Sequence, residues 1–397
     1  MNFWNRNRQK GFAILVALLF LFNSMCMLAV LVFPSVSDFG DTLMLGILIA
    51  AIICFVPRVK FVKSAMLVNI VLLVWILLSY MLYDYAEEIY DILYNYLVWG
   101  FFVSVVLMQD YDFEKVYDYS MVMSVIIIVV MLMAPNRAQN VADEMTWTYS
   151  CFPCLAVIIT HFYTKRKTVK KWVKPAYLIG LVMLFTFIQG ANRGGIVSII
   201  VLVYLIVIKS VNTRSNRVKN HPFINIIALV LMFLAIYYYE DVIKFVYEYL
   251  KANDIEVYSI RKMYRGIVKD DITNMRDELY AFAWEGFKDS PLIGNGIGSF
   301  AVNHGGWPHN LFMQFLYEGG IALFLFMGGI TIYITVFFVT SRKITPTEYA
   351  LFIILFSTTI PKLMFSAQLW KVQGFWMLLV YGLRCIQKYR DVGKLRE

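Results

Sequence analysis

Histidine and cysteine are scarce in this sequence, with four histidines and five cysteines among 397 residues. Cys151 and Cys154 have the C-x-x-C spacing of redox and metal sites, but the other cysteines are scattered singly. A disulfide relay needs a second cysteine pair, and a zinc site needs two more ligands near the first two. The scarcity therefore argues against both kinds of site and favours Cys151 and Cys154 as small packing residues.

The sequence also lacks a polar stretch long enough for a separate soluble domain, an internal repeat and a low-complexity tract. Apolar residues make up 60% of the chain, whereas roughly 45–50% is typical of soluble proteins. Apolar runs about as long as a bilayer is thick recur from end to end. We therefore predict an all-α, polytopic membrane protein with a single membrane domain over residues 1–397. The first run lacks a clean cleavage site, so we interpret it as a retained span.

The apolar runs predict about twelve transmembrane spans. They cover residues 11–33, 42–56, 64–82, 92–108, 119–134, 149–164, 175–190, 194–209, 222–239, 316–339, 349–366 and 372–386. With the N-terminus inside, most basic residues fall in inside segments, and the short outside loops carry mainly acids. Because basic loops face the cytoplasm, both termini are predicted to be cytoplasmic. The same distribution explains the net charge of +9 without a nucleic-acid partner.

One connection is far longer than the others and is predicted to lie outside, at residues 240–315. A long loop in a compact protein usually has a function. The segment 272–286 has the mixed spacing of three and four that is typical of a helix. We therefore expect a large extracytoplasmic loop that contains short helices.

Of the four histidines, only His304 and His309 fall on the outside in this topology. An imidazole that titrates near neutral pH is a suitable general base, and His309 directly precedes a helical run. Asn310, Gln314 and Glu318 recur at every fourth position of that run, a polar stripe that could line a wet groove. The alternative is that His309 only caps the helix and the stripe is an interfacial face.

Arginines supply the other candidate site residues. Arg193 lies at the outer end of two adjacent spans, where a charge is costly and suggests function, although it could also contact lipid headgroups. Gly194 and Gly195 beside it would let an anionic ligand approach. On a helix, Arg261 and Arg265 would share one face that suits a phosphate, or again ordinary headgroups. Arg276 is ambiguous for the same reason.

Three segments together resemble the O-antigen polymerase and O-antigen ligase superfamily, often called Wzy-type. They are Asn192–Arg193–Gly194–Gly195, similar to a Ser-Arg-Gly-Gly element; Arg276 and Trp284 followed by Pro291–Leu292–Ile293–Gly294–Asn295–Gly296–Ile297–Gly298, similar to an arginine-and-tryptophan helix with a glycine turn; and His309–Asn310 with Gln314, Glu318 and Gly319–Gly320. The glycines 294, 296 and 298 are then a turn rather than a nucleotide loop, since no strand precedes them. Asn192, where the family often has serine, departs from the pattern.

The resemblance implies a glycosyltransferase of the cytoplasmic membrane, acting on its outer face without metal or cofactor. The substrate would be an oligosaccharide on undecaprenyl pyrophosphate. Arg193 and Arg276 would bind the pyrophosphate, and His309 would activate the acceptor hydroxyl. We expect Arg265 and Arg261 to add phosphate contacts and Asn310, Gln314 and Glu318 to contact the pyrophosphate or glycan.

The most suitable function is a polymerase that joins repeat units into an O-antigen, capsule or exopolysaccharide, with membrane lipid around it and a flippase and a chain-length regulator as partners. A ligase that moves finished glycan to an acceptor would use the same residues. A transporter or flippase of lipid-linked sugars is the alternative from another class, although such proteins tend to show internal repeats.

Overall fold

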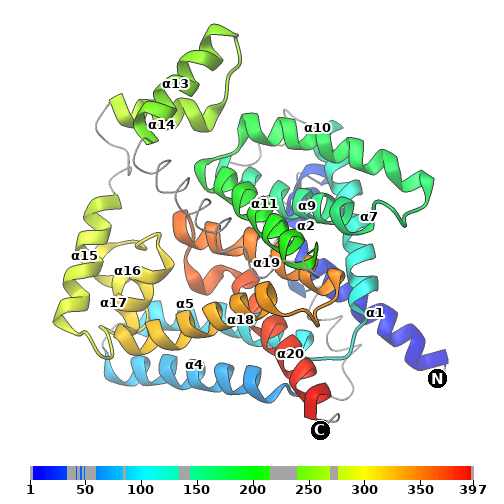
Figure 1. The fold of residues 1–397 in the computed structure, drawn as a ribbon. Helices are drawn as coiled ribbons and strands as arrows, with labels where there is room; N and C mark the ends of the chain where they lie inside the picture. Colours follow the sequence, from blue (N-terminus) through cyan, green and yellow to red (C-terminus); the bar gives the residue numbers. More distant parts are fainter. Residues whose placement is uncertain are drawn as a thin grey trace.

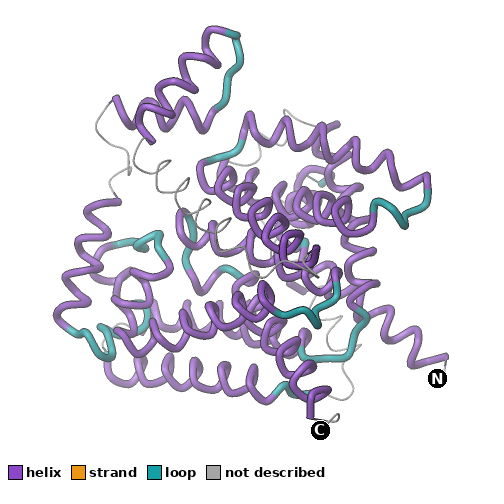
Figure 2. Tube along the Cα trace, viewed as in Figure 1, coloured by secondary structure: helices purple, strands orange, loops and turns teal. Residues whose placement is uncertain are grey.

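The structure is a computed structural model that describes residues 3–33, 60–83, 86–133, 144–214, 239–268 and 276–394, with positions 42, 45, 46 and 49 between them. Every regular element in these ranges is a helix, and Figure 2 shows no strand among them. The all-α prediction is confirmed for this part of the chain.

The helices fall into three groups, before, within and after the large loop. The first group is α1 (Phe3–Phe20), α2 (Phe22–Val32), α4 (Lys63–Leu82), α5 (Ala86–Asn95), the π-helix η2 (Tyr96–Phe102), α6 (Val103–Leu107), α7 (Phe113–Met133), α9 (Glu144–Lys165), the 3-10 helix η3 (Lys171–Val173), α10 (Lys174–Gly190) and α11 (Arg193–Arg214). The loop contains α13 (Tyr239–Ala252), α14 (Tyr258–Val268), α15 (Arg276–Asp289) and α16 (Ser299–His304). The last group is α17 (Leu311–Leu323), the π-helix η4 (Phe324–Gly328), α18 (Gly329–Thr340), α19 (Pro346–Phe365), the 3-10 helix η5 (Leu369–Lys371) and α20 (Gln373–Lys394).

Within the described residues, five helices are long and apolar enough to cross a membrane, or six spans if the bent pair α1 and α2 counts as one. The five are Lys63–Leu82, Glu87–Leu107, Phe113–Met133, Leu311–Thr340 and Pro346–Phe365. Of the other predicted spans, 42–56 and 222–239 lie outside the described residues apart from isolated positions. The chain is therefore an integral membrane protein, whereas the total of about twelve spans and the cytoplasmic termini stay predictions.

The first predicted span, 11–33, is not one straight helix. Leu21 separates α1 from α2 with φ −108° and ψ 19°, and the two helices meet at 80°. The prediction of a retained span stays a prediction, and the bend was not foreseen because hydropathy reports apolar length and carries no information about the direction of the backbone.

The helices α9 and α19 form the centre of the bundle. They pack against each other and share α7 and α11 as neighbours, and α11 crosses in front of α19 in Figure 1. Cys151 and Cys154 are completely buried in α9, and the Cys151 sulfur lies 3.4 Å from that of Met131. The packing interpretation of these cysteines is confirmed.

Side-chain contacts join the segments that connect the helices, in two separate sets. Lys165, at the end of α9, and Thr347, at the start of α19, both bind Glu114. Elsewhere Lys371 of η5 pairs with Asp91 of α5 at 3.3 Å. Each set joins connections predicted to share a side, as alternating spans require; which side faces the cytoplasm stays a prediction.

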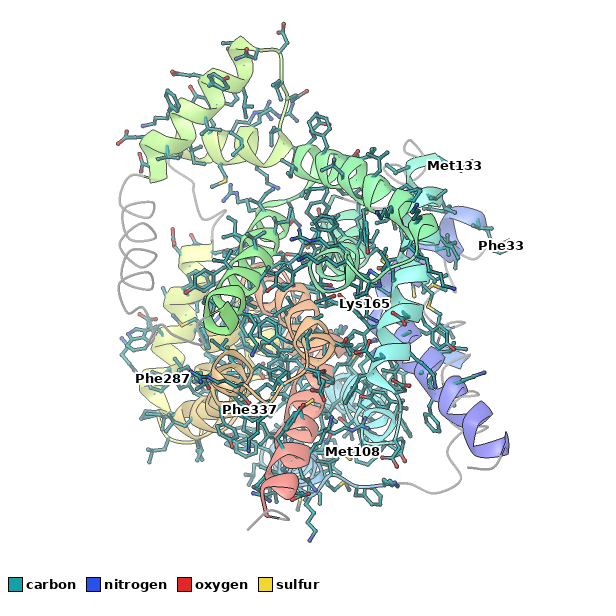
Figure 3. The ribbon with its side chains drawn as sticks, turned by 45° about the vertical axis from the view of Figure 1, so that its right-hand side comes forward. Phe33, Met108, Met133, Lys165, Phe287 and Phe337 are labelled. Atoms are coloured by element: carbon teal, nitrogen blue, oxygen red, sulfur yellow. The ribbon has the colours of Figure 1, made fainter. Side chains whose placement is uncertain are left out.

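Short helices occupy the large loop, as predicted. The helices α13 and α14 form a hairpin at the top of Figure 1 and Figure 3, and α14 contacts the bundle at α10. The rings of Tyr247 and Tyr264 stack with their centroids 4.0 Å apart and hold the hairpin together. In contrast, α15 and α16 pack against α17, so the second half of the loop belongs to the body of the protein.

Candidate functional site

The turn between α10 and α11 is fixed by Asn192. Its backbone N–H donates to Thr148 Oγ1 at 3.1 Å, and its side-chain Oδ1 accepts from the Gly195 N–H at 2.8 Å. Asn192 is therefore the N-cap of α11, a role that serine also fills well. The departure from the Ser-Arg-Gly-Gly pattern keeps the same local structure.

Two glycines in this turn permit close contact with α9. A methyl group on Gly194 would lie 2.2 Å from Tyr149 Oη, and one on Gly195 would lie 2.4 Å from Thr148 Cγ2. Side chains of α9 therefore fill the space beside these glycines, where the sequence led us to expect an approaching ligand. Their function in the fold is to bring Arg193 next to Tyr149.

Arg193 is the first residue of α11 and joins the bundle to the large loop. Its Nη2 donates to the backbone oxygen of Lys262 in α14 at 3.4 Å. This contact is a direct link between the bundle and the α13–α14 hairpin. The contact places Arg193 beside the large loop, and the prediction that both act on one ligand stays a prediction.

His309 lies in the connection between α16 and α17 with a φ of 50°, a left-handed conformation that is uncommon for residues other than glycine. The capping alternative does not apply to it, since Asn310 caps α17 by accepting from the N–H groups of Phe312 and Met313. The Nδ1 atom of His309 is buried and has no hydrogen-bond partner among the described residues. Strained backbone and unpaired buried nitrogens are more typical of functional positions than of structural ones.

Four residues from distant parts of the chain meet at this point, and we call them the His309 group: His309, Arg276, Tyr149 and Ser366. Arg276 begins α15, and its charge acts on both the His309 ring and the Tyr149 hydroxyl. That hydroxyl donates to Ser366 Oγ at 2.9 Å, and the backbone of Ser366 lies beside the His309 ring. The fold thus brings three of the sequence motifs to one place, since Tyr149 also touches the Arg193 turn through Gly194.

Electrostatics favour a neutral imidazole at His309. Burial lowers the pKa of His309 from its ordinary value, and the Arg276 guanidinium lowers it further, while the Ser366 backbone acts in the opposite direction. The ring is therefore unprotonated at neutral pH. In that form it can accept a proton from a hydroxyl group.

The two α14 arginines behave differently from each other. Arg261 forms an ion pair with Glu256 and lies over the Tyr258 ring, 5.8 Å from its centroid. Arg265 is exposed. Nothing in the described residues joins either guanidinium to the His309 group, so their predicted phosphate contacts stay untested.

The polar stripe of α17 faces the interior of the protein. Gln314 and Glu318 are 2% and 0% exposed. Gln314 Nε2 and Trp370 Nε1 donate to the Glu318 carboxylate at 3.1 and 3.3 Å. These side chains fix α17 against η5 and do not line a groove, because the i, i+4 spacing fixes a shared helix face but does not say what covers that face.

The glycine turn packs directly on α17. Gly294, Gly296 and Gly298 all have positive φ, as expected for a turn, and the Gly296 N–H donates to the Glu318 carbonyl at 3.0 Å. A methyl group on Gly294 would lie 2.4 Å from the Gly319 nitrogen. The turn therefore locks α15 to the helix that follows His309.

Residues 178–328 match the family model for O-antigen ligase. This match over part of the chain supports the resemblance to the O-antigen polymerase and ligase superfamily. No curated protein matches the chain. The matched segment contains Arg193, Arg276 and His309, and their roles stay predictions.

Two members of the His309 group lie outside the part matched to the O-antigen ligase family, and sequence reasoning missed both. Tyr149 lies in the second turn of α9, and Ser366 directly follows α19. The available signal was their position, since polar side chains at span ends predicted to be outside lie near the loop. Among the described residues no cluster of three His, Cys, Asp or Glu side chains could hold a metal ion.

Proposed function

We propose that this protein is a polysaccharide polymerase that joins oligosaccharide repeat units carried on undecaprenyl pyrophosphate, at the outer face of the cytoplasmic membrane. The observation that carries the proposal is the buried, neutral imidazole of His309 beside the guanidinium of Arg276. One supplies a base and the other a fixed positive charge, the two groups that a glycosyl transfer from a pyrophosphate needs.

In the proposed reaction, His309 accepts the proton of an acceptor sugar hydroxyl while that oxygen forms a bond to the anomeric carbon of the donor. The bond between that carbon and the pyrophosphate oxygen breaks, and the lipid pyrophosphate leaves with the electron pair. Arg276 and Arg193 hold its negative charge. Gln314 and Glu318 act indirectly, since they orient the helix that begins after His309.

Reconstituted protein supplied with lipid-linked repeat units tests this assignment. We expect His309→Ala to slow elongation by about 10²–10⁴-fold, the usual contribution of a general base. His304→Ala is the matched control, because His304 lies in the same loop but stacks on Phe282 with ring centroids 4.7 Å apart. Elongation at a near-normal rate in the His309 variant would refute the assignment of His309 as the base, whereas no elongation by the unmodified protein would favour a transporter.

Arginine substitution gives a second comparison. We expect Arg276→Gln to abolish most elongation, and Lys288→Gln, an exposed position on the same helix, to have no effect. A ligase would use the same residues, so an experiment in cells is needed to distinguish the two activities. A deletion strain that accumulates single repeat units supports the polymerase, and one that accumulates long lipid-linked chains supports the ligase.

A further inference from the structure

A cavity is lined in part by Tyr149, the residue of the His309 group whose hydroxyl binds Ser366. Its volume is about 340 Å³, within the size range of small-ligand sites. We call it the Lys362 cavity, and its walls come from the α1–α2 corner, positions 42 and 45, α5, η2, α9, α19, η5 and the start of α20. Lys371 of η5 also lines it, but this second lysine is paired with Asp91. The residues used below are Lys362, Tyr149, Asn95, Trp99, Thr358 and Gln373.

Lys362 contributes a positive charge that no acid balances. It lies in the last turn of α19, its ammonium 5.2 Å from the centroid of the Tyr149 ring. Across the described ranges, no carboxylate pairs with it and no hydrogen bond from its ammonium is found. A cation inside a membrane protein is costly unless something compensates it.

Other lysines of the bundle show what compensation looks like here. Lys209 donates to the backbone oxygens of Phe338 and Ser341 at 3.2 and 2.9 Å. Lys388 pairs with the buried Glu348 at 2.6 Å. Lys362 differs from both, because the space next to its ammonium is a cavity rather than a protein acceptor.

The remaining wall suits a carbohydrate. Trp99 and Tyr149 offer ring surfaces, on which the apolar face of a sugar packs. Asn95, Thr358 and Gln373 supply amide and hydroxyl groups that can exchange hydrogen bonds with sugar hydroxyls. A cation beside rings and hydroxyls points to a sugar that itself carries an anion.

We propose that the Lys362 cavity is a glycan subsite for an acidic sugar, whose carboxylate pairs with Lys362. This rests on the proposed function, in which the pyrophosphate lies at Arg276. Since Tyr149 lines the cavity and its hydroxyl is bonded to Ser366, whose backbone lies beside the His309 ring, a glycan that reacts at His309 can extend one sugar into it. The polymer formed would then have an acidic repeat unit.

Thermal unfolding of the reconstituted full chain tests the subsite, with glucuronate, glucose and inorganic pyrophosphate as probes at millimolar concentration. We expect glucuronate to raise the unfolding temperature and glucose to have little effect. Lys362→Gln should weaken the apparent affinity for glucuronate at least about tenfold, the effect of losing a hydrogen bond to a charged group. Lys362→Arg should retain binding, and Lys343→Gln, an exposed lysine elsewhere, should match the unmodified protein.

His309→Ala separates this proposal from the proposed function, because it should lose elongation while keeping the response to glucuronate. Equal responses to glucuronate and glucose would overturn the subsite, and this comparison needs no variant to fold. A response to pyrophosphate that disappears in Lys362→Gln would overturn it too, by assigning the cavity to the phosphate groups of the lipid carrier.

Discussion

Replacing Gly194 by alanine should destabilise the protein through one steric clash, which a second substitution should relieve. The added methyl group would lie 2.2 Å from the Tyr149 hydroxyl oxygen, and the next atom of that side chain, Cζ, is 3.3 Å away. Tyr149 has little room to move, since it is 6% exposed and bonded to Ser366. We expect overpacking here to lower the free energy of unfolding by about 1–3 kcal/mol.

The rescue follows from the same distances. Tyr149→Phe alone removes the hydrogen bond to Ser366 and should cost about 0.5–1.5 kcal/mol. In the Gly194→Ala/Tyr149→Phe double variant the nearest contact is the one at 3.3 Å, which small shifts can accommodate. The double variant should therefore be no less stable than Gly194→Ala, with a coupling energy of about 0.5–3 kcal/mol.

A double-mutant cycle on thermal unfolding of the detergent-solubilised protein measures this coupling. Gly328→Ala is the control, because nothing lies within 4 Å of a methyl group built there. Purely additive losses from the two substitutions would show that Tyr149 does not lie against the Arg193 turn, and the convergence of the motifs would have to be abandoned.

Three further predictions concern pH, the buried network and metal. Because burial and Arg276 lower the pKa of His309, its basic form persists at neutral pH, and elongation should be lost only as the pH falls through that lowered pKa. In Arg276→Gln the pKa of His309 should rise, so the residual activity should be lost at a higher pH than in the unmodified protein. If the acidic side of the profile of kcat/KM against pH does not move in this variant, the role of the arginine is contradicted. Glu318→Ala should lower the free energy of unfolding by about 1–3 kcal/mol, because it leaves the buried donors of Gln314 and Trp370 without an acceptor. The unfolding temperature should be lower than that of the surface control Glu285→Ala. Elongation by reconstituted protein should survive EDTA, since protein cations are proposed to hold the leaving group, and recovery of a lost rate by added Mg²⁺ would contradict that.

The sequence predicted the charged members of the site better than their surroundings. The sequence identified Arg193, Arg276 and His309, because charges and histidines are rare in apolar sequence and because these residues lie in segments that resemble a family. The sequence did not identify Tyr149 and Ser366, since such side chains are common at span ends and only packing shows which of them meet. The electrostatic link from Arg276 to both His309 and Tyr149 is a tertiary property.

For the polar stripe of α17, the sequence identified the residues but not their surroundings. Its period was correct, and α17 does carry Gln314 and Glu318 on one face. Its exposure was not predictable, because η5 covers that face from a segment more than fifty residues later in the chain. In the same way, hydropathy located α1 and α2 but could not predict the 80° bend between them.

The tip of the α13–α14 hairpin offers an experimental handle. Asp254 has a φ of 56° in an exposed turn between the two helices, and the hairpin is closed below it by the stacked tyrosines. Such a tip tolerates inserted sequence well. An epitope placed there can be stained on intact or permeabilised cells, so this small turn can report which side of the membrane the whole loop occupies.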